Sequence, residues 1–275
     1  MLKLSLAALL VMAAAVSAQA QQFKVTTRVI QTSLDEREPE RVLSKSLTLF
    51  HAGRVYDLIP SVGEVTVFDE PHQQFIVFSA RRMIGTKVAF DEVTRMLGTA
   101  REETTNWTAR LLASRDPKSV RVAEPLKFQL APKFEETFDL ASKTLTLQSP
   151  RFSYIVDCQE VDSREILSAY LGYADWAARI NYVLYPDTLY PEPRLLLNDK
   201  LRKLNRLPSR VQLKVDFDQP FQLQAEHRFS WKLESIDRQH LNHWKLKIES
   251  ADMEWISFRE YHRRVIVQQN VQARK

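Results

Sequence analysis

The chain of 275 residues has few glycines and a single cysteine. Five glycines in 275 residues are far fewer than the average glycine content of about 7% would give. None of their spacings fits a phosphate-binding loop or a nucleophile elbow. The lone Cys158 excludes a CxxC redox pair, a cysteine-rich zinc site and an intramolecular disulfide. No nucleophile, base and orienting group occur together in the sequence. We therefore expect no enzymatic activity and no cofactor.

Long hydrophobic runs are also scarce, and the most prominent lies at the N-terminus. Lys3 precedes an apolar run over residues 4–16, and Ala18-Gln19-Ala20 has the small-x-small pattern of a cleavage site. The run is shorter than the roughly 20 apolar residues of a membrane helix. The sequence predicts a cleaved signal peptide over residues 1–20, a mature start at Gln21 and a soluble periplasmic or secreted protein without a transmembrane segment. A retained N-terminal anchor is the alternative.

The charge is only mildly basic, with 39 Lys+Arg against 34 Asp+Glu. Acidic and basic residues are interleaved along most of the chain, unlike the clustered basic residues of nucleic-acid-binding proteins. We therefore expect no nucleic-acid partner. One basic cluster stands out and is a candidate surface for an anionic lipid or an acidic protein partner of the cell envelope: Lys200, Arg202, Lys203, Arg206 and Arg210. A solvated helix face is the favoured alternative.

Alternating apolar and polar residues predict most of the strands. The predicted strands of the first half cover residues 23–29, 43–50, 54–59, 64–69 and 74–80, with a further strand around Thr86 and Val88. In Phe75-Ile76-Val77-Phe78 both faces are apolar, which predicts a central strand covered on both sides. The predicted strands of the second half cover residues 137–140, 143–148, 152–158, 211–217, 221–233 and 244–248.

Three helices are predicted between these strands. Asp91 is the expected cap of a helix that reaches Leu111 and ends at Asp116-Pro117. Ser163 or Asp162 is expected to cap a second helix that reaches Leu184, and a shorter third helix covers residues from about 194 to before Pro208. Short turns join the strands, and no Gly/Ser- or Pro-rich linker divides the chain. The sequence therefore predicts one α+β domain over residues 21–275, with a large curved antiparallel sheet and helices packed on one face.

His227 interrupts the apolar face of a long predicted strand, and aromatic residues surround it in the sequence. The candidate ligand-binding residues are His227, Phe229, Trp231 and Trp244. Core packing is the favoured alternative for each of them, with the histidine hydrogen-bonded inside the core. Cys158 shares a strand face with apolar residues, which predicts a small core residue and not a reactive thiol.

Asp237, His240 and His243 carry donors that zinc accepts, spaced by three residues. This spacing fits one face of a helix, but the surrounding sequence predicts a turn between strands. No HExxH motif accompanies the three residues. A solvated polar turn is therefore the favoured interpretation, and we expect no metal site.

The order of elements resembles the LolA/LolB-like superfamily of exported lipoprotein carriers. The resemblance rests on the predicted signal peptide, the first-half helix after several hairpins, Phe138-Asp139-Leu140, Leu145-Thr146-Leu147, Tyr154 and the long strand pair over residues 217–233. It implies an unclosed antiparallel barrel whose concave face is covered by helices, and it transfers no functional residue to this chain.

Two functions remain open from the sequence. The first is an exported protein that binds a hydrophobic or lipid-like ligand between sheet and helices, which the resemblance implies and the many aromatic residues allow. The second is a non-catalytic structural or protein-interaction component of the bacterial envelope with a filled core. A cavity lined by apolar side chains would favour the first function, and a solid core would favour the second.

Overall fold

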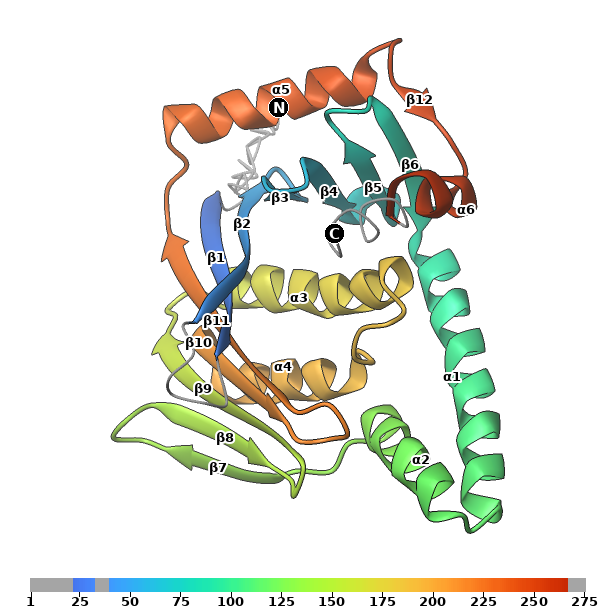
Figure 1. The fold of residues 1–275 in the computed structure, drawn as a ribbon. Helices are drawn as coiled ribbons and strands as arrows, with labels where there is room; N and C mark the ends of the chain where they lie inside the picture. The colour runs from blue at the N-terminus through green and yellow to red at the C-terminus, as the bar shows by residue number, and fades with distance from the viewer. Residues whose placement is uncertain (1–21, 33–39, 267–275) are drawn as a thin grey trace, which may run out of the picture.

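A single open sheet of twelve strands organises the described part of the chain, residues 22–32 and 40–266 of the computed structural model. The strands follow the order β12-β6-β5-β4-β3-β2-β1-β11-β10-β9-β8-β7 (Figure 1). All neighbouring pairs are antiparallel except β12, which runs parallel to β6. The predicted α+β class with a large antiparallel sheet is therefore confirmed. The predicted signal peptide and mature start at Gln21 lie outside the described residues.

The strands are β1 (Phe23–Thr32), β2 (Arg41–His51), β3 (Arg54–Ile59), β4 (Glu64–Asp69), β5 (Gln74–Ser79), β6 (Ile84–Ala89), β7 (Glu135–Asp139), β8 (Thr144–Gln148), β9 (Phe152–Glu160), β10 (Arg206–Val215), β11 (Phe221–Ser230) and β12 (Glu254–Trp255). The α-helices within the described residues are α1 (Phe90–Ala113), α2 (Pro117–Leu130), α3 (Arg164–Leu184), α4 (Glu192–Leu204), α5 (Ser235–Glu249) and α6 (Phe258–Tyr261).

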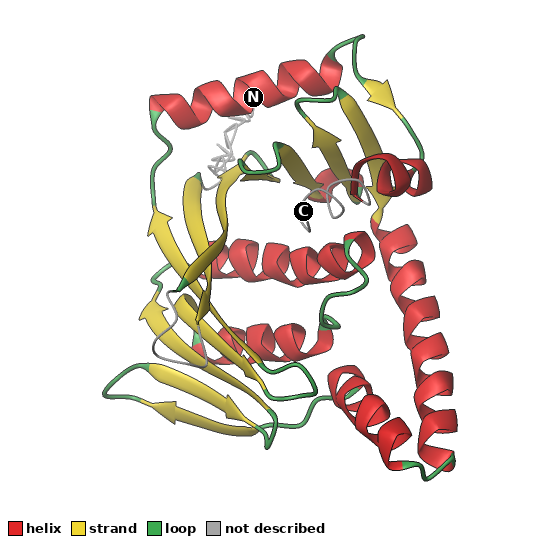
Figure 2. Cartoon of the chain, in the orientation of Figure 1, coloured by secondary structure: helices red, strands yellow, loops and turns green. Residues whose placement is uncertain are grey.

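The sheet consists of two runs of strands that meet at β1 and β11. The strands from β1 to β6 follow one another as a meander, and so do β7 to β9, after which α3 and α4 lead to β10. β1 and β11 are far apart in sequence but pair from Lys24↔Ser230 to Thr32↔Gln222. The sheet curves around α3 and α4, which lie on its concave side (Figure 2).

Both faces of the sheet are apolar where β3 to β5 lie. Phe75 and Val77 belong to the larger core, which contains residues of α3 and α4. Ile76 and Phe78 belong to a second core on the opposite face. The prediction of a strand covered on both sides is therefore confirmed.

Helix α5 covers the opposite face of the sheet and corrects the sequence prediction for this region. A turn was expected around residues 237–243 and a strand over 244–248, because Trp244, Leu246 and Ile248 alternate. The structure has one helix, which begins with a capping box between Glu234 and Asp237. Trp244 is buried in the second core, whereas Leu246 is 68% exposed, so the burial follows the helical period and not the strand period.

Helix α2 was not predicted, because Asp116-Pro117 was interpreted only as the end of the preceding helix. Helix α1 ends at Ala113, and Asp116 caps α2 by accepting a hydrogen bond from the Ser119 amide at 2.9 Å. Pro117 occupies the first turn of α2, where a missing N–H has no cost. At the other end of α1, Ala89 is the cap, and the expected cap Asp91 lies in the first turn.

Cys158 lies in the larger core on β9, as predicted. Burial raises the pKa of its thiol to about 11. The thiolate is the form that attacks thiol reagents. We expect a maleimide to label Cys158 only after the protein is unfolded in denaturant, which mass spectrometry of native and unfolded samples would measure. Rapid labelling of the native protein would show that β9 opens in solution.

Candidate functional site

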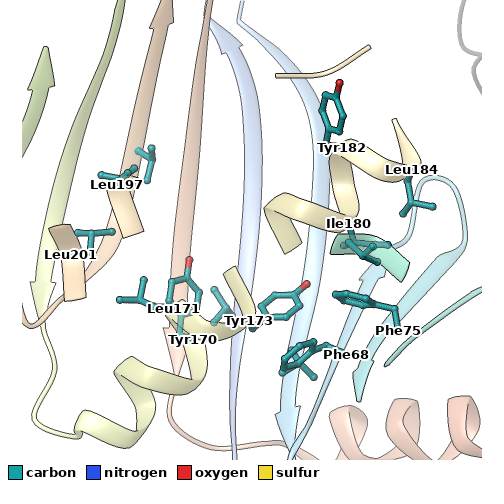
Figure 3. Packing of buried hydrophobic residues seen from close by; sticks show 14 of the residues in the cluster. Phe68, Phe75, Tyr170, Leu171, Tyr173, Ile180, Tyr182, Leu184, Leu197 and Leu201 are labelled. Atoms are coloured by element: carbon teal, nitrogen blue, oxygen red, sulfur yellow. The ribbon is translucent and has the colours of Figure 1, made fainter. Parts of the chain in front are cut away.

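A cavity of about 480 Å³ lies between the concave face of the sheet and helices α3 and α4. Strands β1 to β4 and β9 to β11 form its floor, and α3, the 185–191 connection and the start of α4 form its roof. Tyr170, Tyr173 and Ile180 lie on the side of α3 that faces the strands (Figure 3). The volume lies within the range of about 300–1,000 Å³ that is usual for small-molecule sites.

Small side chains on α3 leave this space open. Ala174, Ala177 and Ala178 line the cavity from the helix, and Ala225 lines it from β11 on the floor. The spacing of three and four residues places the helical alanines on one face of α3. Larger side chains at these positions would fill the space between helix and sheet, as they do in a close-packed core.

Polar residues cross the floor of the cavity in register. Thr27 of β1 is paired with His227 of β11 on one side and with Ser46 of β2 on the other. Further along the sheet, Asp57 of β3 is paired with Thr48 of β2. Because side chains of paired residues project from the same face of a sheet, these groups form a polar band in a mainly apolar cavity.

Asp57 and Glu64 form the acidic end of this band. The Thr48 hydroxyl donates to Asp57 at 2.6 Å, and Ser46 and Tyr173 also form hydrogen bonds with this carboxyl. Burial nevertheless raises the pKa of Asp57. No basic side chain of the described residues forms an ion pair with it.

Glu64 is buried beside the C-terminal segment of the described chain. The Tyr261 hydroxyl of α6 donates to Glu64 Oε2 at 3.1 Å, and Tyr185 after α3 forms a second hydrogen bond. Burial raises the pKa of Glu64 to about 7, and the neighbouring charge of Asp57 adds to this effect. Glu64 thereby connects α6, the end of α3 and the cavity floor.

His227 and Arg194 belong to the other polar end of the cavity. His227 Nδ1 and Thr27 Oγ1 lie 3.0 Å apart, and the His227 Nε2 is buried without a hydrogen-bond partner among the described residues. Burial and, secondarily, the charge of Arg194 lower the pKa of His227 to about 3, so the imidazole is neutral at physiological pH. Arg194 projects from the first turn of α4 into the cavity lining.

The structure separates the four candidate ligand-binding residues. His227 lines the cavity, and Phe229 lies next to it in the core, with its ring 5.0 Å from that of Tyr170. The predicted strand reaches Leu233, but β11 ends at Ser230. Trp231 therefore lies beyond the strand, where it is 48% exposed and stacks on Phe229. Trp244 lies on the opposite face of the sheet, where it stacks on Tyr56 of β3. Only His227 is placed where a ligand in the cavity touches it.

Each member of the basic cluster has an acidic partner. The ion pairs are Lys200–Glu136, Arg202–Asp175, Lys203–Asp199, Arg206–Glu160 and Arg210–Asp157. Because these contacts compensate the positive charge locally, the cluster offers little net attraction to an anionic partner.

Asp237, His240 and His243 lie on α5, and the expected turn is absent at these positions. The Asp237 carboxylate accepts hydrogen bonds from Lys24 at 2.9 Å and from the Glu234 amide at 2.8 Å. His240 stacks on Trp244 with ring centroids 5.5 Å apart. No cluster of three metal-ligating side chains is present in residues 22–32 and 40–266.

Sequence reasoning missed Asp57, Glu64 and Arg194. Asp57 interrupts the apolar strand Val55-Tyr56-Asp57-Leu58-Ile59 in the way that His227 interrupts its own strand, so the same criterion would have found it. Glu64 stands at the start of β4 and Arg194 in the first turn of α4, and nothing in the local sequence marks either position as part of a cavity. These residues line one cavity because strands distant in sequence pair in the sheet, and the local sequence pattern does not specify this pairing.

Among the helices described, none is long and apolar enough to cross a membrane. No protein-family model matches the chain, and no curated protein matches it.

Proposed function

We propose that the protein is an exported, non-catalytic binding protein that holds a hydrophobic, lipid-like ligand in the cavity between the sheet and α3. The observation that carries the proposal is the cavity itself, about 480 Å³ in volume and lined mainly by apolar and aromatic side chains. Each methylene transferred from water to such a site contributes about 0.8 kcal/mol. An open antiparallel sheet with helices on its concave side is also what the resemblance to LolA/LolB-like carriers implies.

Native mass spectrometry of the exported protein, before and after extraction with organic solvent, tests this proposal. We expect a co-purified mass of lipid size that extraction removes, and uptake of an added fluorescent fatty acid by the extracted protein. A bare protein mass together with no uptake would contradict the proposal. That result would favour the alternative of a structural or protein-interaction component of the envelope.

A further inference from the structure

We propose that the ligand of the cavity is an amphiphile with an anionic headgroup, which Arg194 binds while the apolar chain lies along the alanine face of α3. This inference rests on the proposed function and adds the chemical class of the headgroup. It follows from a difference between the two polar ends of the cavity. At the acidic end, other side chains of the protein already form hydrogen bonds with the polar groups, whereas at the Arg194 end such partners are lacking.

Arg194 is a cavity-lining cation without a counterion. Among the described residues, no carboxylate forms an ion pair with its guanidinium and no group forms a hydrogen bond with that side chain. Arg194 lines the same cavity as Tyr154 of β9, Tyr170 of α3 and His227 of β11, and its charge acts on all three. The five cations of the basic cluster all have acidic partners, whereas Arg194 has none among the described residues.

The groups around Arg194 are hydrogen-bond donors or able to become donors. The Tyr154 and Tyr170 hydroxyls have no hydrogen-bond partner in the described part of the chain. When His227 Nδ1 accepts a hydrogen bond from the Thr27 hydroxyl, the buried Nε2 carries the proton and lacks an acceptor. A carboxylate or phosphate offers several acceptor oxygens and a charge that Arg194 binds bidentately. This end of the cavity therefore fits an anion.

The carboxyl groups at the acidic end do not need a ligand as a hydrogen-bond partner. Hydroxyl groups of Thr48, Ser46 and Tyr173 surround Asp57, and those of Tyr185 and Tyr261 surround Glu64. Buried polar groups that already have partners gain little from a further one. A cationic headgroup at this end is the competing arrangement.

The test compares four ligands that share one alkyl chain: dodecanoate, dodecyl phosphate, dodecanol and dodecylammonium. Each is titrated by calorimetry into the extracted full-length protein and into Arg194→Met. Because a hydrogen bond between charged groups is stronger than one to a neutral hydroxyl, we expect at least one of the two anions to bind about tenfold tighter than dodecanol. Arg194→Met should remove that advantage, so that the anions bind the variant no tighter than dodecanol does. The ratio of the two anions distinguishes a carboxylate headgroup from a phosphate headgroup.

Two further variants control for indirect effects. Arg95→Met removes an exposed arginine of α1 outside the cavity and should leave all four affinities unchanged. Arg194→Lys retains the charge and should retain part of the preference for anions. Equal binding of all four ligands, or tightest binding of dodecylammonium, would overturn the anionic headgroup and leave the proposed function standing. Failure of all four to bind would contradict the proposed function as well.

Discussion

Replacing Glu64 with glutamine is expected to stabilise the folded protein by about 3 kcal/mol more at pH 8 than at pH 4. The pKa of Glu64 is raised from 4.5 to about 7 in the folded protein, chiefly by burial. Between these two pH values the Glu64 carboxyl is ionised in the unfolded chain but protonated in the folded protein. Stability is therefore lost as pH rises through this window, by about 1.4 kcal/mol per pH unit.

Glutamine removes this loss because it does not ionise. At pH 4 the wild-type carboxyl is protonated in the folded state and mostly protonated in the unfolded state, so the substitution then measures only the change from acid to amide. The glutamine carbonyl can still accept the hydrogen bonds of Tyr185 and Tyr261. The difference between the two pH values thus isolates the ionisation of Glu64.

Urea denaturation of wild type and variant at both pH values measures this difference. Glu124→Gln, at an exposed position of α2, provides the matched control and should shift stability equally at pH 4 and pH 8. An equal effect of Glu64→Gln at the two pH values would show that Glu64 ionises normally and that water reaches it in the folded protein.

Ionisation of His227 changes the folding stability with pH in the opposite direction to that of Glu64. Its pKa is lowered from 6.5 to about 3, so the unfolded state binds a proton that the folded state does not, and stability is lost as pH falls through this window. Between pH 4.5 and 6.5 the contributions of His227 and Glu64 oppose each other. Removing the Glu64 contribution by Glu64→Gln should therefore make stability rise more with pH in this range than it does in the wild type.

Local pattern was sufficient for most of the sheet but not for helices α2, α5 and α6. The hairpins of the first half follow from the short-range alternation of apolar and polar residues. The two-sided burial of Phe75 to Phe78 follows from the apolar residues on both faces of that strand. Helix α5 was mistaken for a turn and a strand because Trp244, Leu246 and Ile248 satisfy a period of two by coincidence. The capping pair Glu234 and Asp237 was the contrary evidence in the sequence.

The candidate site was predictable only in part. His227 stood out because one polar residue interrupts an apolar strand, and it does line the cavity. Its neighbours there come from segments far apart in the chain, such as Thr27, which is 200 residues away along the sequence. The pairing of β1 with β11 creates this proximity, and no local pattern in either strand specifies that partner.

Filling the cavity from both walls is expected to weaken ligand binding by at least about 100-fold, whatever the headgroup. The variant Ala177→Phe/Ala225→Phe places one ring on α3 and one on β11, at positions that line opposite sides of the cavity. Rings that displace about four methylenes of a ligand remove roughly 3 kcal/mol of binding free energy. The loss should apply to dodecanol as well as to dodecanoate, since both depend on the same apolar space.

The control double variant is Ala169→Phe/Ala113→Phe, which adds the same rings at exposed positions of α3 and α1. Urea denaturation establishes that both variants fold, and filling an empty apolar space should change stability by no more than about 1–3 kcal/mol. Arg194→Met and the filled cavity then give different results: the first removes the preference for anions, and the second lowers affinity for every ligand of the series. Unchanged affinity in the filled variant would place the ligand outside the cavity, even if the protein binds lipid.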